Sequence, residues 1–295
     1  MVTQLEWIEN LKYILHPMGE VGSRHDNSSV KAERGFLSLY TSKNPNTRYN
    51  KLSASEQAMN ELGRLVDVYT QRGEDVSITI TGHSLGGALA LLNAYEVAAK
   101  GLNSHKSHPD RTVPVTVFSF GAPRAGNEAF KDRLEALGVK VLRVVSKQDI
   151  VPKVPGIIFH EGMENFEQLI RPFLELLPWT YTHVGVELKL DHRRSPFLKQ
   201  NPDPAESHNL EGYLHLLDGF KCSSAPFRGN AKRDVALVNK ASNMVRDDLM
   251  VPGNWYQMEN KGLVRNFYGK WVQPERECED VPSPSHVLQE SLSID

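Results

Sequence analysis

The chain has 295 residues, of which 40% are hydrophobic and 24% charged, and its formal net charge is −2. Such a composition is typical of a globular protein with a sizeable core, and the length suits one α/β domain or two small ones. Because no basic stripe with interleaved aromatic residues is present, nothing indicates nucleic-acid binding. No apolar run is long enough to span a bilayer, and the opening stretch MVTQLEWIENL lacks the pattern of a secretory signal.

The cysteine content is low, since Cys222 and Cys278 lie in loop-like sequence without a C-x-x-C spacing. This pattern predicts neither a disulfide framework nor a zinc site. A reducing compartment fits it best.

The elements expected before residue 75 are mostly helices. Apolar residues at helical spacing predict a short helix over residues 4–15. Residues 16–34 are polar and rich in Gly and Ser, which predicts a loop, and we consider this loop a candidate lid. The apolar stretch GFLSLY should then pack near the glycine-rich turn at residues 82–87. A capping-box pattern at Ser53 starts a helix that ends near Gly73. Its apolar face comprises Met59, Leu62, Leu65, Val66 and Tyr69.

Strands and helices alternate over the next part of the chain. β-Branched residues predict a short buried strand over 76–81, and a helical pattern follows at 89–100. A hydrophilic loop then leads to a second buried strand, VPVTVFSFGAPR, a helix over 127–137 and a third strand over 139–149. This alternation predicts an α/β fold, with a mostly parallel sheet and helices on both faces. The three strands should lie side by side with their carboxyl ends at one edge.

The pattern is less regular over residues 153–180. The segment FEQLIRPFLELLPW is compatible with an amphipathic helix. That helix would either cover the core or form a lipid-facing wall of an active-site cleft. A further strand is predicted over residues 183–191.

The carboxyl-terminal part begins with a helix that starts at or just after His208. One more helical pattern covers residues 231–250. From residue 273 the sequence is rich in proline and charge, which predicts a disordered tail over 273–295 and a single domain over 1–272.

The segment Gly82-His83-Ser84-Leu85-Gly86 lies between a predicted strand and a predicted helix. In that context G-x-S-x-G indicates a nucleophile elbow, in which glycines let the strand and helix approach and the serine hydroxyl stands clear of the sheet. The alternative is a glycine-rich turn with a structural serine. We expect the N–H of Leu85 to donate to a developing oxyanion. His83 is expected to support the turn by hydrogen bonding, because it points the wrong way to take the serine proton.

A serine nucleophile needs a base and a carboxylate that orients it. Asp149 ends the third strand, at the same sheet edge as Ser84, and is the preferred acid. Asp191 also ends a strand and is the alternative. The alternative for either residue is that it has no catalytic role and is a solvated aspartate that ends a strand.

Five histidines lie between Asp149 and the predicted tail. His208 lies where a long loop meets a helix, a position from which a side chain can reach back over an active site, and it is the preferred base. His183 is the alternative. The remaining three are less suited, since they lie within a helix, on a surface edge or in the irregular segment: His215, His192 and His160.

Several segments together resemble the plant phospholipase A1 group of the class 3 lipases, specifically its class I, plastid-type members. They include GHSLGGALA, FSFGAPRAGN, KVLRVVSKQDIVPKVPG, HVGVELKLD, HNLEGYLHLLDGF and RDVALVNKAS. The resemblance extends from about Val2 to Trp271 and implies an α/β-hydrolase fold. It also implies that Ser84 is the nucleophile, Asp149 the orienting acid and His208 the base.

The resemblance implies an activity as well. Members of this group hydrolyse the sn-1 acyl ester of membrane glycerolipids, phosphatidylcholine and galactolipids among them, without a metal or organic cofactor. We therefore expect lipid as substrate, peripheral contact with a membrane and a chloroplast location.

The chain departs from the family pattern at its start. The family has a strand ending in Trp-Arg-Gly-Thr immediately before a stretch like VTQLEW, and the threonine region supplies a second oxyanion donor. Here Met1 stands in that place, which suggests an N-terminally shortened version without the upstream strands. Two alternatives follow from these observations. The chain acts on triacylglycerol or another carboxylic ester, or it is a non-catalytic lipid-binding remnant.

Overall fold

The computed structural model describes most of the chain. The described residues are 14–21, 29–47, 50–105, 108–155, 180–203, 206–222, 224–229, 232–256, 264–268 and 271–272. The predicted helix over residues 4–15 lies outside this part except for its last two residues, and the predicted tail lies outside it entirely.

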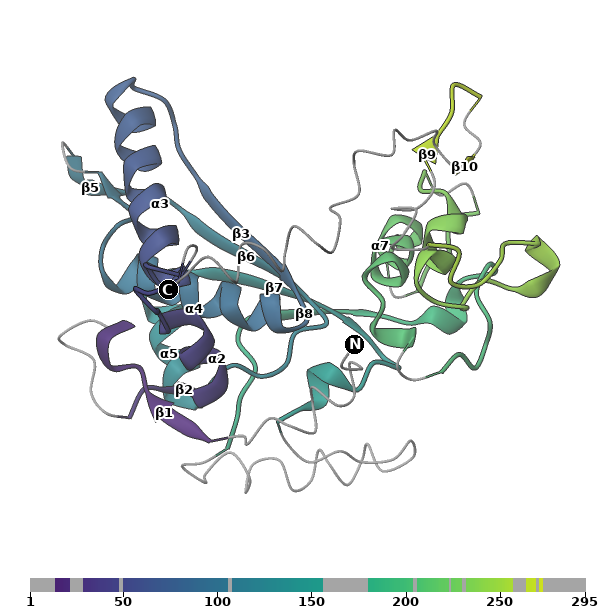
Figure 1. The fold of residues 1–295 in the computed structure, drawn as a ribbon, viewed down its shortest axis with the longest axis horizontal. Coiled ribbons are helices and arrows are strands. Elements are labelled where there is room, and N and C mark those ends of the chain that lie inside the picture. Colours follow the sequence, from purple (N-terminus) through teal and green to yellow (C-terminus); the bar gives the residue numbers. More distant parts are fainter. Residues whose placement is uncertain are drawn as a thin grey trace, which may run out of the picture.

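Four parallel strands form the central sheet (Figure 1). Their order is β3-β6-β7-β8, so that the strand before the glycine-rich turn, β3, lies at the edge of the sheet and pairs with β6. This arrangement confirms the predicted parallel sheet and brings the carboxyl ends of all four strands to one edge. The strands are β3 (Ile78–His83), β6 (Val115–Phe120), β7 (Lys140–Ser146) and β8 (Val186–Leu190).

Helices cover the two faces of the sheet unequally. Side chains of α4 (Leu85–Ala99) and α5 (Glu128–Ala136) share one buried cluster with the strands. Within it the rings of Tyr95 and Phe130 stack, with centroids 5.3 Å apart. The opposite face meets α7 (Leu210–Gly219) near the carboxyl ends of β7 and β8. Figure 1 accordingly places α4 and α5 on one side of the strands and α7 at the far end.

Two amino-terminal helices pack on α4. These are α2 (Arg34–Thr41), which contains the GFLSLY stretch, and α3 (Ala54–Gln71). The predicted capping box is present, because Ser53 accepts from the N–H of Glu56 and Glu56 accepts from the N–H of Ser53. The prediction was wrong for Tyr69, which is 39% exposed. It lies in the last turn of α3, beyond the residues that face α4.

The polar segment over residues 16–34 is not a simple loop. Its ends form a two-stranded antiparallel ribbon of β1 (Leu15–Pro17) and β2 (Lys31–Glu33). Apolar anchors that the polar composition obscured hold this ribbon to the core, namely Met18, Val21 and Val30. The predicted helix therefore cannot extend to residue 15, and only residues 22–28 of the candidate lid fall outside the described part.

Two other predictions are corrected. The hydrophilic loop after α4 contains a second ribbon, β4 (Ser104–His105) with β5 (His108–Thr112). Residues 231–250 form no α-helix in their described part. Two 3-10 helices occur there, and the side chain of Asn239 in the first of them accepts from the N–H of Val245 and donates to the carbonyl of Val251. These elements are Val235–Lys240 and Asp247–Leu249, followed by β9 (Val264–Arg265) and β10 (Trp271–Val272).

Short 3-10 helices fill the remaining connections. They are Gly19–Val21, Val151–Lys153, His192–Arg194 and Glu206–His208. Within the described residues, no helix has the length and apolar character that crossing a bilayer would require.

Candidate active site

The turn between β3 and α4 holds Ser84 in an unusual backbone conformation. Its φ is 57° and its ψ is −130°, a region that non-glycine residues rarely occupy. Two glycines make the turn possible. A Cβ on Gly82 would lie 2.1 Å from the carbonyl oxygen of Gly86, and one on Gly87 would lie 2.6 Å from Ala122. A Cβ on Gly86 would meet nothing within 4 Å, so the close approach of β3 and α4 depends on Gly82 and Gly87.

The three side chains that the sequence singled out lie in one hydrogen-bonded row. Ser84 Oγ is 2.7 Å from His208 Nε2, and His208 Nδ1 is 2.7 Å from Asp149 Oδ2. His208 and Asp149 are buried, whereas Ser84 is only partly covered. Because an ionised carboxylate can only accept, His208 carries its proton on Nδ1 and leaves Nε2 free to accept from the serine hydroxyl. The row therefore has the geometry of a serine, histidine and aspartate triad.

Asp149 has further donors that sequence reasoning missed. The hydroxyl of Tyr213 donates to Oδ2 at 2.6 Å, and the N–H of Val151 donates to Oδ1 at 2.8 Å. Tyr213 in turn accepts from the N–H of Ser146 at 3.0 Å. Burial, followed by the charge of Asp149, raises the pKa of Tyr213 well above its usual value, so the phenol stays a donor. These bonds satisfy a carboxylate that is fully buried and fix its orientation.

His83 contacts the backbone of His208. Its Nε2 is 2.8 Å from the carbonyl oxygen of His208, and the two rings lie 4.6 Å apart between centroids. A carbonyl only accepts, so His83 donates from Nε2. Burial, together with repulsion from His208, lowers the pKa of His83 to about 4. His83 is therefore neutral near pH 7, and the predicted supporting role agrees with its contacts.

The start of α4 faces the triad. Leu85 is the first residue of the helix, so its N–H has no acceptor within the helix and is available to a ligand. The partial positive charge at a helix amino terminus favours an anion at the same place. Gly121 closes the other side, with a φ of +56°, and a Cβ there would lie 2.9 Å from Asp149 Oδ2.

The alternative candidates lie elsewhere. Asp191 accepts from Gln148 at 2.7 Å, and His183 contacts the carbonyl of Pro152 at 2.8 Å. His192 is buried and contacts the carbonyl of Gln200. None of these three is hydrogen-bonded to Ser84, and His160 lies outside the described residues.

A second serine and histidine pair is present, but it is buried. Ser195 Oγ is 2.8 Å from His215 Nε2, and both residues are at most 2% exposed. Burial lowers the pKa of His215 to about 4. A substrate cannot reach this pair, so it belongs to the core below α7. Among the described residues, no group of three or more His, Cys, Asp or Glu side chains is suited to hold a metal ion.

Comparison with known proteins decides the family. Residues 1–159 match the family model described as lipase (class 3). The chain belongs to the class 3 lipase family. Ser84 and Asp149 both lie within the matched residues, whereas His208 lies beyond them.

Relatives of this class 3 lipase include plant phospholipases A1. It is 50% identical to phospholipase A1-Igamma1, chloroplastic, of Arabidopsis thaliana, over 93% of this chain and 53% of the relative. It is 37% identical to phospholipase A1-II 4 of Oryza sativa subsp. japonica, over 95% of this chain and 64% of the relative. The first identity confirms the resemblance to class I members. The chain spans about half the length of the Arabidopsis relatives it matches.

Solved structures of fungal lipases are also similar. A triacylglycerol lipase from Penicillium expansum is 19% identical, with a TM-score of 0.42, over 65% of this chain and 58% of that chain.

Proposed function

We propose that this class 3 lipase is a serine acyl-ester hydrolase of the phospholipase A1 type, with membrane glycerolipids as substrates. The observation that carries the proposal is the row of two 2.7 Å contacts from Ser84 through His208 to Asp149. The strained serine at the start of α4 adds support, because this conformation exposes a nucleophile beside a helix amino terminus.

The proposed reaction proceeds in two halves. His208 Nε2 takes the proton of Ser84 as Oγ attacks the acyl carbonyl, and the N–H of Leu85 donates to the resulting oxyanion. The tetrahedral intermediate collapses, His208 returns the proton to the leaving alcohol, and an acyl-enzyme remains. Water then gives a proton to His208 and attacks the acyl group, which releases the fatty acid and restores Ser84. Asp149 holds the imidazole and stabilises its charged form throughout.

The finer features of the proposal rest on the relatives. Three Arabidopsis proteins that are 45% to 50% identical are named as chloroplastic phospholipases A1. We infer sn-1 specificity, activity on phosphatidylcholine and galactolipids, peripheral membrane contact and a chloroplast location by analogy with this group.

The test is fatty-acid release from vesicles of phosphatidylcholine and galactolipid whose sn-1 and sn-2 acyl chains differ. The native chain is compared with Ser84→Ala and with Ser195→Ala, a matched change at the buried serine that also contacts a histidine. We expect sn-1 fatty acid from the native chain and Ser195→Ala. Ser84→Ala should fall by a factor of about 10⁶, since the triad acts as a unit.

Other results would redirect the proposal. Release from triacylglycerol emulsions but not from vesicles would identify a triacylglycerol lipase. A folded native chain that releases no fatty acid and does not react with a fluorophosphonate at Ser84 would contradict a hydrolase and favour a lipid-binding role.

A further inference from the structure

The far end of α7 carries a concave basic surface that takes no part in the site around Ser84. Its volume is about 450 Å³. We call this surface the basic basin. It is lined by Asp218, Lys221, Pro226, Phe227, Arg228, Gly229 and Lys232.

Local packing fixes the backbone of the basin. The ring of Phe227 lies directly on the end of α7, where a Cβ on Gly219 would come within 1.9 Å of it. The N–H of Arg228 donates to the carbonyl of Gly219 at 3.0 Å, and the N–H of Arg233 donates to Asp218 Oδ2 at 2.8 Å. The segment after α7 is thus tied back to the helix at two points, so the basin is a built feature of the fold.

The basin has an excess of positive charge. Lys221, Arg228 and Lys232 are exposed, and none has an ion-pair partner within the described part of the chain. Asp218 is the carboxylate among the lining residues, so three positive charges face one negative charge. The chain as a whole has a net charge of −2. The basin is therefore a local positive region on a protein of slightly negative charge.

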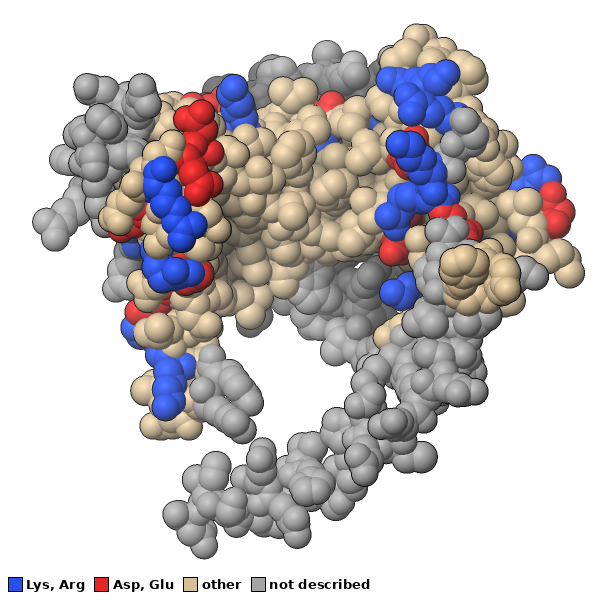
Figure 2. Space-filling model, turned by 90° about the horizontal axis from the view of Figure 1, so that it is seen from above, with Lys and Arg blue, Asp and Glu red and all other residues tan. Residues whose placement is uncertain are grey.

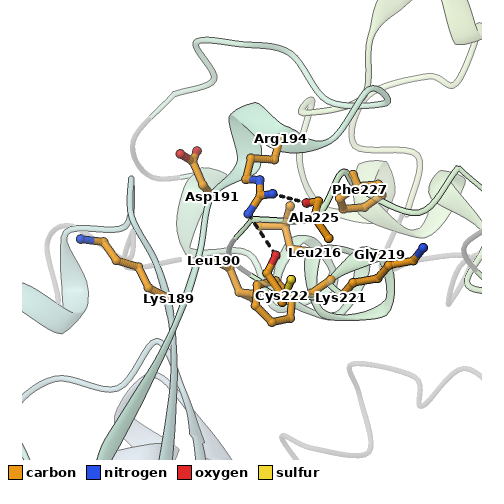
Figure 3. A pocket seen from close by; sticks show the side chains of 11 residues that line it. Lys189, Leu190, Asp191, Arg194, Leu216, Gly219, Lys221, Cys222, Ala225 and Phe227 are labelled. Atoms are coloured by element: carbon orange, nitrogen blue, oxygen red, sulfur yellow. Dashed lines mark hydrogen bonds between the residues drawn. The ribbon is translucent and has the colours of Figure 1, made fainter.

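A smaller cavity of about 60 Å³ extends this region (Figure 3). It shares Lys221 and Phe227 with the basin and adds Lys189, Arg194 and the acidic Asp191, so the added residues carry one net positive charge. The guanidinium of Arg194 donates to the carbonyl oxygens of two loop residues, Cys222 and Ala225. In Figure 2, basic side chains lie on the right-hand part, where Figure 1 has α7, with acidic ones among them; charged side chains of both signs also lie on the left, and the middle of this face is nearly free of charge.

The position relative to the triad argues for docking. His208 precedes α7 and the basin follows it, so the ten residues of the helix separate them by about 15 Å. That separation is too large for the basin to hold the headgroup of the lipid whose ester lies at Ser84. It is short enough for both to meet the same lipid surface.

We propose that the basic basin docks this protein onto a lipid surface that carries anionic headgroups. The inference rests on the proposed function, because an enzyme that hydrolyses membrane lipids must first adsorb to the membrane. Charge complementarity selects the partner. A chain of negative net charge is weakly repelled by an anionic membrane unless a positive region faces it, and each lysine or arginine near such a surface strengthens binding severalfold.

The test measures binding apart from hydrolysis. Ser84→Ala protein, which leaves the vesicles intact, is sedimented with phosphatidylcholine vesicles that contain or lack phosphatidylglycerol. We expect binding to the anionic vesicles only, and weaker binding at high salt. The triple change Lys221→Gln, Arg228→Gln and Lys232→Gln in the same background should lower the partition coefficient about 100-fold at low salt.

A second triple variant serves as the control. Lys51, Arg72 and Lys140 are exposed on other parts of the molecule, and changing all three to Gln alters the net charge equally. We expect this control variant to bind within about twofold of the Ser84→Ala protein, since the three cations that it lacks do not face the lipid together. Circular dichroism confirms that each variant is folded.

Two results would overturn the docking proposal: equal binding to vesicles without phosphatidylglycerol, or equal losses in the two triple variants. The proposed function is tested by a different measurement, the hydrolysis of a water-soluble ester by the chain with native Ser84. Absence of this hydrolysis would contradict the proposed function. That reaction needs no membrane, so docking and catalysis can fail separately.

Discussion

At the scale of single residues, the site depends on contacts that hold Asp149 and His208 from behind. Tyr213 donates to the same carboxylate oxygen as His208, and His83 donates to the backbone of His208. Both supporting residues touch the base or the acid, and neither is hydrogen-bonded to Ser84. We assign them positioning roles in the proposed reaction, in which the orientation of the imidazole limits proton transfer.

Replacing Tyr213 with Phe tests the support of Asp149. The change removes one donor from the carboxylate and leaves the N–H of Ser146 without an acceptor. A hydrogen bond to a charged group contributes about 1.5 kcal/mol, so we expect kcat to fall about tenfold while KM stays within twofold. Tyr69→Phe at an exposed position is the control. An unchanged kcat in a folded Tyr213→Phe protein would show that the other contacts of Asp149 suffice.

Gly121→Ala tests how tightly the triad is enclosed. The new methyl group would lie 2.9 Å from Asp149 Oδ2 and 3.2 Å from a ring carbon of His208. Displacing either residue breaks the row, so we expect kcat/KM to fall by about 100-fold. Gly138→Ala is matched to it, since Gly138 also has a positive φ but meets nothing within 4 Å. Both variants should lose about 1 kcal/mol in the free energy of unfolding. Equal kcat/KM values for the two variants would refute the prediction.

At the scale of elements, a buried polar network joins the three helices beside the sheet. Glu96 on α4 is 1% exposed and accepts from Tyr40 on α2 at 2.5 Å and from Ser55 on α3 at 2.7 Å. Lys100, one turn later, donates to it at 2.6 Å. Burial, then the hydrogen bond to Glu96, raises the pKa of Tyr40 well above its usual value. The network fixes how α2 and α3 sit on the helix that begins at Ser84.

Glu96→Ala should therefore destabilise the fold. The change leaves the hydroxyls of Tyr40 and Ser55 buried without their acceptor, which costs about 2–4 kcal/mol in the free energy of unfolding. Urea unfolding followed by circular dichroism measures this loss. Glu61→Ala on the exposed face of α3, where the carboxylate pairs with Arg64, should cost far less, because water screens the pair. A Glu96→Ala protein as stable as Glu61→Ala would disprove the structural role of the network.

At the scale of the whole molecule, two buried histidines make stability depend on pH. The pKa values of His83 and His215 are both lowered to about 4, in each case mainly by burial. In the unfolded chain these imidazoles take up protons near pH 6.5. Between about pH 6.5 and 4 the unfolded state therefore binds more protons, so stability is lost as the pH falls through this window.

We expect the free energy of unfolding to drop by up to about 1.4 kcal/mol per pH unit for each of the two histidines. Urea midpoints at pH 7.5 and pH 5 test this. A His215→Gln variant, which cannot be protonated at that position, should show a smaller drop between the two values. Equal midpoints at both pH values in the native chain would contradict the predicted linkage.

Features that depend on local pattern could be predicted from short stretches of sequence. Glycine spacing predicted the elbow at Ser84, and alternating strands and helices predicted the parallel order β3-β6-β7. Strand ends and a loop-to-helix junction then indicated Asp149 and His208, because parallel strands bring their carboxyl ends to one edge. These signals are contained in short segments, so composition and period reveal them.

Contacts between distant segments could not be predicted in this way and depend on the packing of the fold. Tyr213 is 64 residues from Asp149, and His83 is 125 residues from the carbonyl it binds. The ribbon of β1 and β2 formed in polar sequence because three buried apolar residues anchor it, and the 3-10 helices after residue 234 formed because side chains such as Asn239 satisfy the backbone. Such pairings depend on which elements pack together, and no local period encodes that packing.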